Sequence, residues 1–199
     1  MKKLLLVLLA LLMLVTMAGC DKGKVSDNWK DMEFKLAGEK YSFPLFFKDF
    51  GDKGWQLDVN EELKPGEYTV ETYLMQNEDF YDEDNNAYAI IAVDFENYSD
   101  SAKKIKDCDI YWIFFSRVYN EVLKNAYELE LAKGIKWGST EQEIYAAYGS
   151  LGEDDKIPSE DGALILVYDA EYKNMFVRMV LYVDEEIGLF AVTLSRIPM

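Results

Sequence analysis

The pattern of apolar and polar positions is clearest in the last third of the chain. Three apolar runs follow one another there, at residues 163–170, 175–184 and 189–196. In the middle run, Val177 and Met179 alternate with the intervening side chains, which is the two-residue period of a β-strand. Because short connections separate the runs, they predict an antiparallel meander of three strands.

A short helix is predicted directly before this meander. Thr140 and Glu143 have the spacing of a capping box, in which each side chain bonds the backbone N–H of the other residue. Ser139 and Gln142 have the same spacing and form the alternative box. Gly149 follows at the position where helices commonly end. We therefore expect a helix that packs on one face of the meander.

The first half of the chain follows a similar order of elements. Apolar positions in residues 34–43 alternate on both sides of Ala37 and Gly38, which predicts a hairpin. Pro44 at a first helical position and Gly51 at the C-terminal cap position predict a short helix between them. Further extended segments are expected at 55–59, 68–75, 88–97 and 108–115, with polar loops at 78–86 and 152–162. Residues 120–131 are compatible with helix or strand, and an extended 126–131 is the preferred interpretation.

These patterns predict an α+β fold of two tandem modules, each a short helix packed on an antiparallel sheet of three to four strands. The interpretation rests on the order of the elements, because residue identity between the two halves is weak. Within the short segment before the first module, Trp29 is expected to pack on the domain, with the membrane head-group zone as the alternative. The expected divisions are a signal peptide at 1–19, a tether at 20–31, a first module at 32–120 and a second module at 121–199.

The first nineteen residues have the pattern of a secretory signal. Lys2 and Lys3 precede an uninterrupted run of twelve apolar residues at 4–15. Twelve residues at about 1.5 Å each form a helix of about 18 Å, which is shorter than a bilayer core of about 30 Å. The small residues Ala18 and Gly19 follow this run, as is typical of signal cleavage sites. A retained transmembrane anchor is the alternative.

The four residues Met17-Ala18-Gly19-Cys20 resemble a bacterial lipobox, with Met17 in place of the usual Leu. The resemblance implies cleavage between Gly19 and Cys20 and a diacylglyceryl group on the thiol of Cys20. The mature chain would then be 180 residues long and would carry two or three acyl chains, such as palmitate. Two or more chains are enough for stable anchoring, here to the extracytoplasmic face of the cell membrane.

Charge and residue types limit the partners of the mature chain. It contains 19 basic and 37 acidic residues, a formal charge of −18. Such a surface repels phosphates, so nucleic-acid binding is disfavoured, and lipid on Cys20 rather than a basic patch would hold the protein to the membrane. The chain has no histidine, and Cys108 is its only cysteine besides Cys20. These counts exclude an intramolecular disulfide and a zinc site of the Cys/His type.

An acidic segment has part of a calcium-loop pattern. Asp82, Asp84 and Asn86 stand at positions one, three and five of such a loop. The pattern fails at position six, where Ala87 replaces Gly, and at position twelve, where Val93 replaces Glu. A solvated acidic turn is the preferred interpretation, and weak calcium binding is the alternative.

Other reactive side chains have simple structural interpretations. Cys108 lies in an apolar run, so we expect a buried and unreactive thiol rather than a nucleophile. Two acidic pairs, Asp154-Asp155 and Glu160-Asp161, lie in a polar segment. Carboxylates need burial to gain pKa values suited to acid–base catalysis, so both pairs are expected to be solvated charge.

Aromatic side chains are more numerous than a small core requires. Most are expected in the core, but Tyr111, Trp112, Trp137 and Tyr145 are candidates for a partner-binding face. The full group that raises this question is Tyr111, Trp112, Phe114, Phe115, Trp137, Tyr145 and Tyr148.

The chain as a whole resembles a group of poorly characterised lipoproteins from Gram-positive, clostridia-like bacteria. The second half is also similar to the small helix-plus-sheet repeat of the β-lactamase-inhibitor-protein and SmpA/OmlA group. That likeness implies protein binding or scaffolding in the cell envelope and no catalytic residues. The resemblance rests on the lipobox, on residues 34–38 with Phe43-Pro44 and Gly54-Trp55, on 95–100 with Asp107-Cys108, and on 134–140 with 147–149.

The sequence therefore predicts a membrane-anchored binding protein that is not an enzyme. We expect a protein partner and the membrane as its contacts, and no nucleic acid, cofactor or metal. An envelope enzyme with a carboxylate pair assembled by the fold is the alternative. A solute-binding lipoprotein of a transporter is a third option, which 180 residues without two α/β lobes disfavour.

Overall fold

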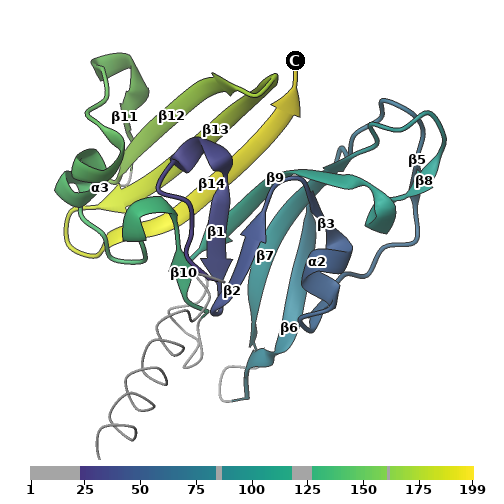
Figure 1. The fold of residues 1–199 in the computed structure, drawn as a ribbon. Helices are drawn as coiled ribbons and strands as arrows, with labels where there is room; N and C mark the ends of the chain where they lie inside the picture. Colours follow the sequence, from purple (N-terminus) through teal and green to yellow (C-terminus); the bar gives the residue numbers. More distant parts are fainter. Residues whose placement is uncertain (1–22, 84–86, 118–126, 161) are drawn as a thin grey trace, which may run out of the picture.

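The computed structural model describes residues 23–83, 87–117, 127–160 and 162–199 (Figure 1). Most of the strands belong to one antiparallel sheet with the order β11-β12-β13-β14-β9-β7-β6-β4, and β3 also pairs with β9. Its strands are β3 (Leu45–Phe46), β4 (Trp55–Gln56), β6 (Tyr73–Asp82), β7 (Ala87–Glu96), β9 (Asp109–Ser116), β11 (Lys156–Pro158), β12 (Leu164–Tyr172), β13 (Met175–Asp184) and β14 (Gly188–Pro198).

Smaller elements form a second layer on one face of this large sheet. Figure 1 shows β1, β2 and α2 in front of the strands β7, β9 and β14. Strands fill 48% of the structure and helices 16%, so the α+β class with antiparallel sheets is as expected. The remaining elements are β1 (Glu33–Leu36), β2 (Glu39–Ser42), β10 (Leu129–Glu130), β5 (Glu62–Leu63), β8 (Lys103–Lys104), α2 (Phe47–Gly51), α3 (Glu141–Tyr148), η1 (Trp29–Asp31), η2 (Ile105–Asp107), η4 (Ala132–Gly134) and η5 (Glu153–Asp155).

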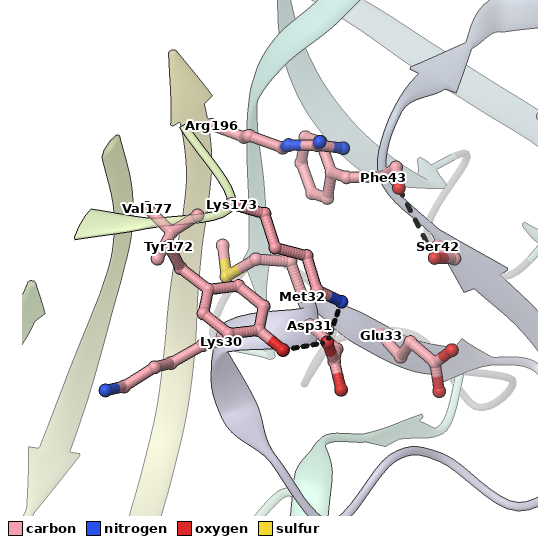
Figure 2. A pocket seen from close by; sticks show the side chains of 10 residues that line it. All are labelled: Lys30, Asp31, Met32, Glu33, Ser42, Phe43, Tyr172, Lys173, Val177 and Arg196. Atoms are coloured by element: carbon pink, nitrogen blue, oxygen red, sulfur yellow. Dashed lines mark hydrogen bonds and ion pairs between the residues drawn. The ribbon is translucent and has the colours of Figure 1, made fainter. Parts of the chain in front are cut away.

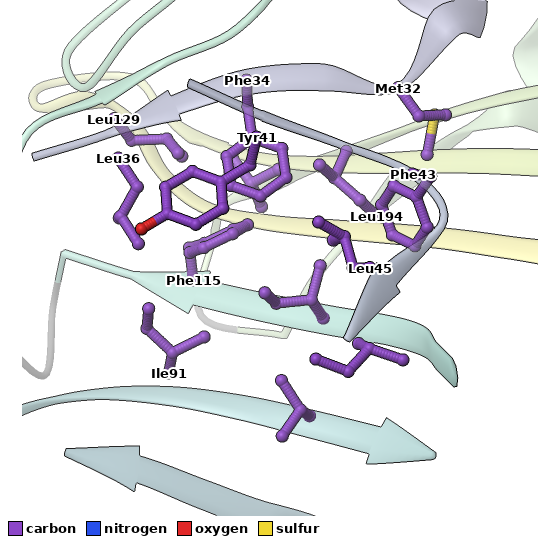
Figure 3. Packing of buried hydrophobic residues seen from close by; sticks show 14 of the residues in the cluster. Met32, Phe34, Leu36, Tyr41, Phe43, Leu45, Ile91, Phe115, Leu129 and Leu194 are labelled. Carbon is purple, nitrogen blue, oxygen red and sulfur yellow. The ribbon is translucent and has the colours of Figure 1, made fainter. Parts of the chain in front are cut away.

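The core lies between the two layers and follows the alternation of the strands. In β9, for example, Ile113 and Phe115 are fully buried. Phe34 from β1 meets Phe115 edge-on, with ring centroids 5.1 Å apart, and stacks on Tyr41 of β2 at 5.3 Å (Figure 3). Aromatic pairs at this range add to the stabilisation that burial of their apolar surface supplies.

The predicted hairpin and capped helix are both present. Ala37 and Gly38 have φ values of 51° and 82°, as the two central residues of a type I′ turn require. At α3, the Glu143 backbone N–H donates to Thr140 Oγ1 at 3.3 Å, and the Thr140 N–H donates to Glu143 Oε2 at 2.9 Å. Ser139 instead accepts a hydrogen bond from the Lys136 N–H, so the Thr140 box is the one that forms.

The helix predicted after Pro44 was placed too early. Leu45 and Phe46 form β3 and pair with Ile110 and Asp109 of β9. Their backbone is therefore part of the large sheet and does not form a helical turn. The helix α2 starts only at Phe47. Gly51 is its last residue rather than its cap.

Two further boundaries differ from the sequence prediction. Residues 68–72 were expected to be strand, but they contribute only a single bridge between Tyr68 and Glu96, and β6 starts at Tyr73. Residues 78–82 were expected to be loop, but they extend β6 because its end pairs with the start of β7. The polar segment 152–162 also contains η5 and the edge strand β11.

The strands of the two halves of the chain are joined. β6, β7 and β9 form one meander, and β12, β13 and β14 form another, as the apolar runs predict. β14 pairs with β9 over five residue pairs, so both meanders belong to one sheet. β10, from the second half, pairs with β1 of the first half. The two halves of the chain therefore share one sheet.

Candidate functional site

The second face of the large sheet has no covering element within the described residues. Leu74, Ala92, Phe114, Thr193 and Val180 lie in register across β6, β7, β9, β14 and β13. All five alternate with residues of the buried face, so their side chains point to the opposite side of the sheet. We call this side the open face.

An aromatic row runs along the open face. Its members are Trp112, Phe114, Tyr182 and Phe190, all of them partly buried. Trp112 and Phe114 stack at 6.1 Å with an interplanar angle of 10°, and Phe114 meets Tyr182 edge-on at 6.3 Å. Tyr182 lies 6.3 Å from Phe190. The rings therefore form a continuous apolar strip on a surface with no described cover.

Only part of this row is predicted from the sequence. Trp112 is a predicted candidate, and it lies on the open face. Tyr182 and Phe190 are not among the predicted candidates. The signal that marks Tyr182 is the second apolar set of β13, which also includes Phe176 and Val180. A strand with two apolar sets does not reveal which one faces the core.

An acidic corner adjoins one end of the aromatic row; we use this name for Asp94, Glu96, Tyr98, Asp109 and Tyr111. Glu96 pairs with Asp109 between β7 and β9, and a bulge next to Asp94 leaves Tyr111 as the extra residue of β9. The Tyr98 hydroxyl donates a hydrogen bond to Glu96, which raises the pKa of Tyr98 further above its ordinary value than burial alone does. Carboxylates and phenols are thus gathered at one end of the open face.

Burial changes the acid–base properties of this corner. It raises the pKa of Asp94 above its ordinary value, against the opposing effect of a hydrogen bond from Thr72. The Oδ1 atom of Asp94 is buried and has no hydrogen-bond partner. Burial also raises the pKa of Asp109, and it raises that of Tyr111 to about 12 with help from the charges of Asp94 and Glu96. The corner is therefore an acceptor-rich site next to an aromatic strip.

The four aromatic candidates do not share one surface. Tyr111 and Trp112 lie at the open face. Trp137 lies on the covered side, where its Nε1–H donates to the carbonyl of Tyr127 at 3.1 Å. Tyr145, on α3, also packs against the core of the covered side.

Cys108 is buried, as the sequence predicts. Its side chain has no exposed surface, and its Sγ–H donates to the carbonyl of Lys104 at 3.3 Å. Burial raises the pKa of the thiol, and the nearby carboxylates add to this shift while Lys103 opposes it. A protonated and enclosed thiol is a poor nucleophile.

The acidic candidates offer no assembled metal site in the part of the chain that is described. Asp154 and Asp155 are exposed on η5, and Glu160 is exposed as well. No group of three or more His, Cys, Asp or Glu residues within the described ranges has the geometry to hold a metal ion. Asp161 lies outside these ranges, and so do residues 84–86 of the calcium-like segment.

The predicted lipidation site lies outside the described residues, which begin at Gly23. This applies to the signal peptide, to Gly19 and to Cys20. None of the helices within the described ranges is long and apolar enough to cross a membrane. Later in the segment that was expected to be a tether, Val25 is buried and Trp29 packs edge-on against Tyr168 at 5.9 Å. Residues 25–31 therefore belong to the folded domain.

Comparison with known proteins adds no further assignment. The chain matches no family model, and no curated protein or solved structure matches it either. A functional interpretation therefore rests on the open face, its chemistry and the sequence.

Proposed function

We propose that this protein is a membrane-anchored extracytoplasmic lipoprotein that binds another protein through its open face. The anchor would be lipid on Cys20, after cleavage between Gly19 and Cys20. The observation that carries the binding role is the aromatic row, because partly exposed Trp and Tyr side chains in contiguous apolar strips are typical of protein interfaces. In this interpretation the two meanders are tandem modules whose sheets have joined to form one surface.

The area of the open face suits a partner of protein size. The six long strands are separated by five spacings of about 4.8 Å, and each contributes about eight residues at about 3.3 Å. The resulting surface is about 600 Å². Standard protein interfaces bury about 800 Å² on each side. The face is thus large enough to supply most of one side of a specific interface.

Charge indicates what kind of protein surface would fit. Asp169 on this face is neutralised by Arg178, whose guanidinium bonds both carboxylate oxygens at 2.7 and 2.8 Å. Asp94 and Glu96 at one end and Glu171 at the other have no such basic partner among the ion pairs of the described residues. The complementary surface has an apolar centre and a basic rim, so binding should weaken as salt is added.

Photo-crosslinking of the full chain in the producing bacterium tests this proposal. A photoreactive amino acid replaces Leu74 on β6 or Ile197 on β14, both on the open face, or Ile187 as a control in the turn between β13 and β14. Ile197 and Ile187 are a matched pair, with exposed fractions of 40% and 39%. We expect one protein to be captured from Leu74 and Ile197 but not from Ile187. Equal capture at all three positions, or none from the open face, would contradict the proposal.

The anchor has its own test. A Cys20→Ala variant should lose acyl label and leave the membrane fraction, because the acyl chains supply the anchor and a mature chain with a formal charge of −18 is repelled by anionic head groups. An unchanged acyl label together with unchanged sedimentation would show that the anchor is assigned to the wrong residue.

The acidic corner gives the alternative function, an envelope enzyme, a specific location. Asp94 and Asp109 are carboxylates whose pKa values are raised by burial, which is a common property of catalytic acids. Under the binding proposal, Asp94→Asn alters partner affinity only. Hydrolase activity that this single change abolishes would favour the enzyme.

A further inference from the structure

A small cavity lies on the covered side, away from the open face. Its volume is about 330 Å³, and it lies, open on one side, between η1, the start of β1, the end of β2 and the turn between β12 and β13 (Figure 2). Met32, Phe43 and Val177 form its apolar part and are nearly fully buried. The rest of the lining is polar, and its three basic side chains outnumber its two acidic ones, which is the reverse of the balance in the whole chain.

The two carboxylates of the cavity are already supplied with donors. Asp31 accepts hydrogen bonds from the Ser26 and Tyr172 hydroxyls at 2.7 and 2.8 Å and from Lys173 Nζ at 3.0 Å. Glu33 Oε2 accepts from the Ser26 N–H and forms an ion pair with Lys40, both at 2.7 Å. These contacts neutralise both acids from within the fold, so neither one needs a basic ligand.

The basic side chains retain unused hydrogen-bond donors. Arg196, on β14, lines the cavity and is partly buried, yet its guanidinium has no ion pair or hydrogen bond with any described residue. Burial raises the pKa of Asp109 and the charge of Arg196 opposes that rise, but the two side chains form no ion pair. Lys173 uses two of its three N–H groups, on Asp31 and on the Tyr172 hydroxyl, so one remains unused. Lys30 points away from both but adds a third positive charge to the lining (Figure 2).

A guanidinium without a partner is costly when it is partly withdrawn from water. The chain carries 37 acidic residues against 21 basic ones, so a carboxylate partner for Arg196 would be easy to supply. Arg196 lines a half-open cavity instead, beside Phe43 and with Lys173 on the adjoining wall (Figure 2). The cavity thus has cationic donors from two different elements, which suits an anion with several acceptor oxygens.

We propose that this cavity binds the phosphate group of a small ligand, with Arg196 as the principal donor and Lys173 as the second. The volume lies at the lower end of the range for small-molecule sites and accommodates a phosphate with a short organic group. The phosphate can come from a free phosphate ester or from a phospholipid head group. The proposal does not depend on the open face and requires no protein partner.

Calorimetric titration of the detergent-solubilised full-length protein tests the site. The probes are inorganic phosphate and glycerophosphoglycerol, the head group of phosphatidylglycerol, at an ionic strength held constant with NaCl. We expect saturable binding that Arg196→Gln weakens about tenfold or more, and Arg196→Lys by less, because Lys keeps the charge but not the planar fork. Lys64→Gln is the control, since it removes one charge from a side chain that is 80% exposed and distant in the fold.

Each outcome decides the question. Saturable binding that Arg196→Gln weakens and Lys64→Gln leaves within about twofold supports the site, and the tighter probe identifies the source of the phosphate. Saturable binding should also raise the melting temperature of the wild type but not of Arg196→Gln. Absence of saturable binding of either probe overturns the proposal. An equal effect of both substitutions also overturns it, because only the overall charge would then matter.

Discussion

Asp31 accepts a 2.8 Å hydrogen bond from the hydroxyl of Tyr172, which follows it by 141 positions in the chain. Lys173 Nζ donates to the same oxygen at 3.0 Å, and Ser26 Oγ donates to the other at 2.7 Å. These bonds tie the segment before β1 to the turn between β12 and β13. They therefore connect the two ends of the folded domain.

The Asp31 contacts predict a pH-dependent contribution to stability. Hydrogen bonds from Ser26 and Lys173 hold the pKa of Asp31 below its ordinary value of 3.8. The contribution is therefore fully present above the unfolded-state pKa and is lost as the pH falls through the lower folded-state value. Since the carboxylate is about one quarter exposed, we expect Asp31→Asn to cost about 1 kcal/mol at pH 7.

Urea denaturation of wild type and Asp31→Asn at pH 7 and pH 3 measures this effect. The difference between the two proteins should shrink at pH 3. Tyr172→Phe should cost about 1 kcal/mol at pH 7 and less at pH 3, because its hydroxyl donates to the same carboxylate and that bond weakens when Asp31 is protonated. Asp27→Asn is a control, since Asp27 is 65% exposed. A difference for Asp31→Asn that stays constant with pH would contradict the assignment.

A close backbone approach makes Gly188 sensitive to substitution. Its φ is +72°, and a Cβ at this position would collide with the backbone of Gly138. Gly66 has a similar φ of +74° but open space around it. We expect Gly66→Ala to cost about 1 kcal/mol from the left-handed backbone alone, and Gly188→Ala about 2 kcal/mol more. Chemical denaturation of both variants checks this, and equal losses would show that the contact with Gly138 has no effect.

Asn97 joins the loop after β7 to the segment before Gly66. It is fully buried, and its Nδ2 donates to the carbonyls of Leu63 and Ser101, both at 2.8 Å. Its Oδ1 accepts from the N–H and hydroxyl of Ser99. The amide group thus makes four hydrogen bonds without exposure to water.

Removal of this amide should be costly. We expect Asn97→Ala to lose about 3 kcal/mol of stability, because four partners lose a bond. Asn77→Ala is the comparison, since Asn77 is also buried but its amide makes two bonds, to Lys53 and Asp79. Its loss should be about half as large. Asn97→Asp should be worse than Asn97→Ala at pH 7, because a carboxylate would face two carbonyl oxygens. Equal stability of the three variants in urea titrations would contradict this account.

The sequence predicts those elements whose signals are local. The capping box at Thr140 and the turn at Ala37 and Gly38 each depend on a few neighbouring residues, and both occur as expected. The strands β12, β13 and β14 follow from alternation within single runs. Elements that are determined by interactions between neighbouring residues can thus be predicted from the sequence.

Strand pairing between segments that are far apart in the chain cannot be predicted in the same way. Leu45 and Phe46 belong to an apolar run compatible with a helix, and only their pairing with β9 makes them a strand. The union of the two meanders depends on the pairing of β14 with β9, which no local pattern specifies. The cavity beside Arg196 has the same origin, because it forms between elements from both ends of the chain.

The open face was only partly predictable for a related reason. Aromatic content indicated that some rings would be exposed, but it did not indicate which ones. Trp112 stands in an apolar run and Trp137 among polar residues, yet Trp112 lies on the open face and Trp137 packs against Tyr127. The sheet order determines which side of each strand is covered.

Burial of Cys108 gives the last prediction, which concerns thiol reactivity. The thiol has no exposed surface, and burial raises its pKa, so both access and ionisation are unfavourable in the folded protein. The native full chain should react with a thiol reagent at pH 8 many times more slowly than the same chain in urea. A Cys108→Ser variant provides the blank, so that any signal from Cys20 is subtracted. Labelling at the same rate with and without urea would show that Cys108 is accessible and would contradict its position in the core.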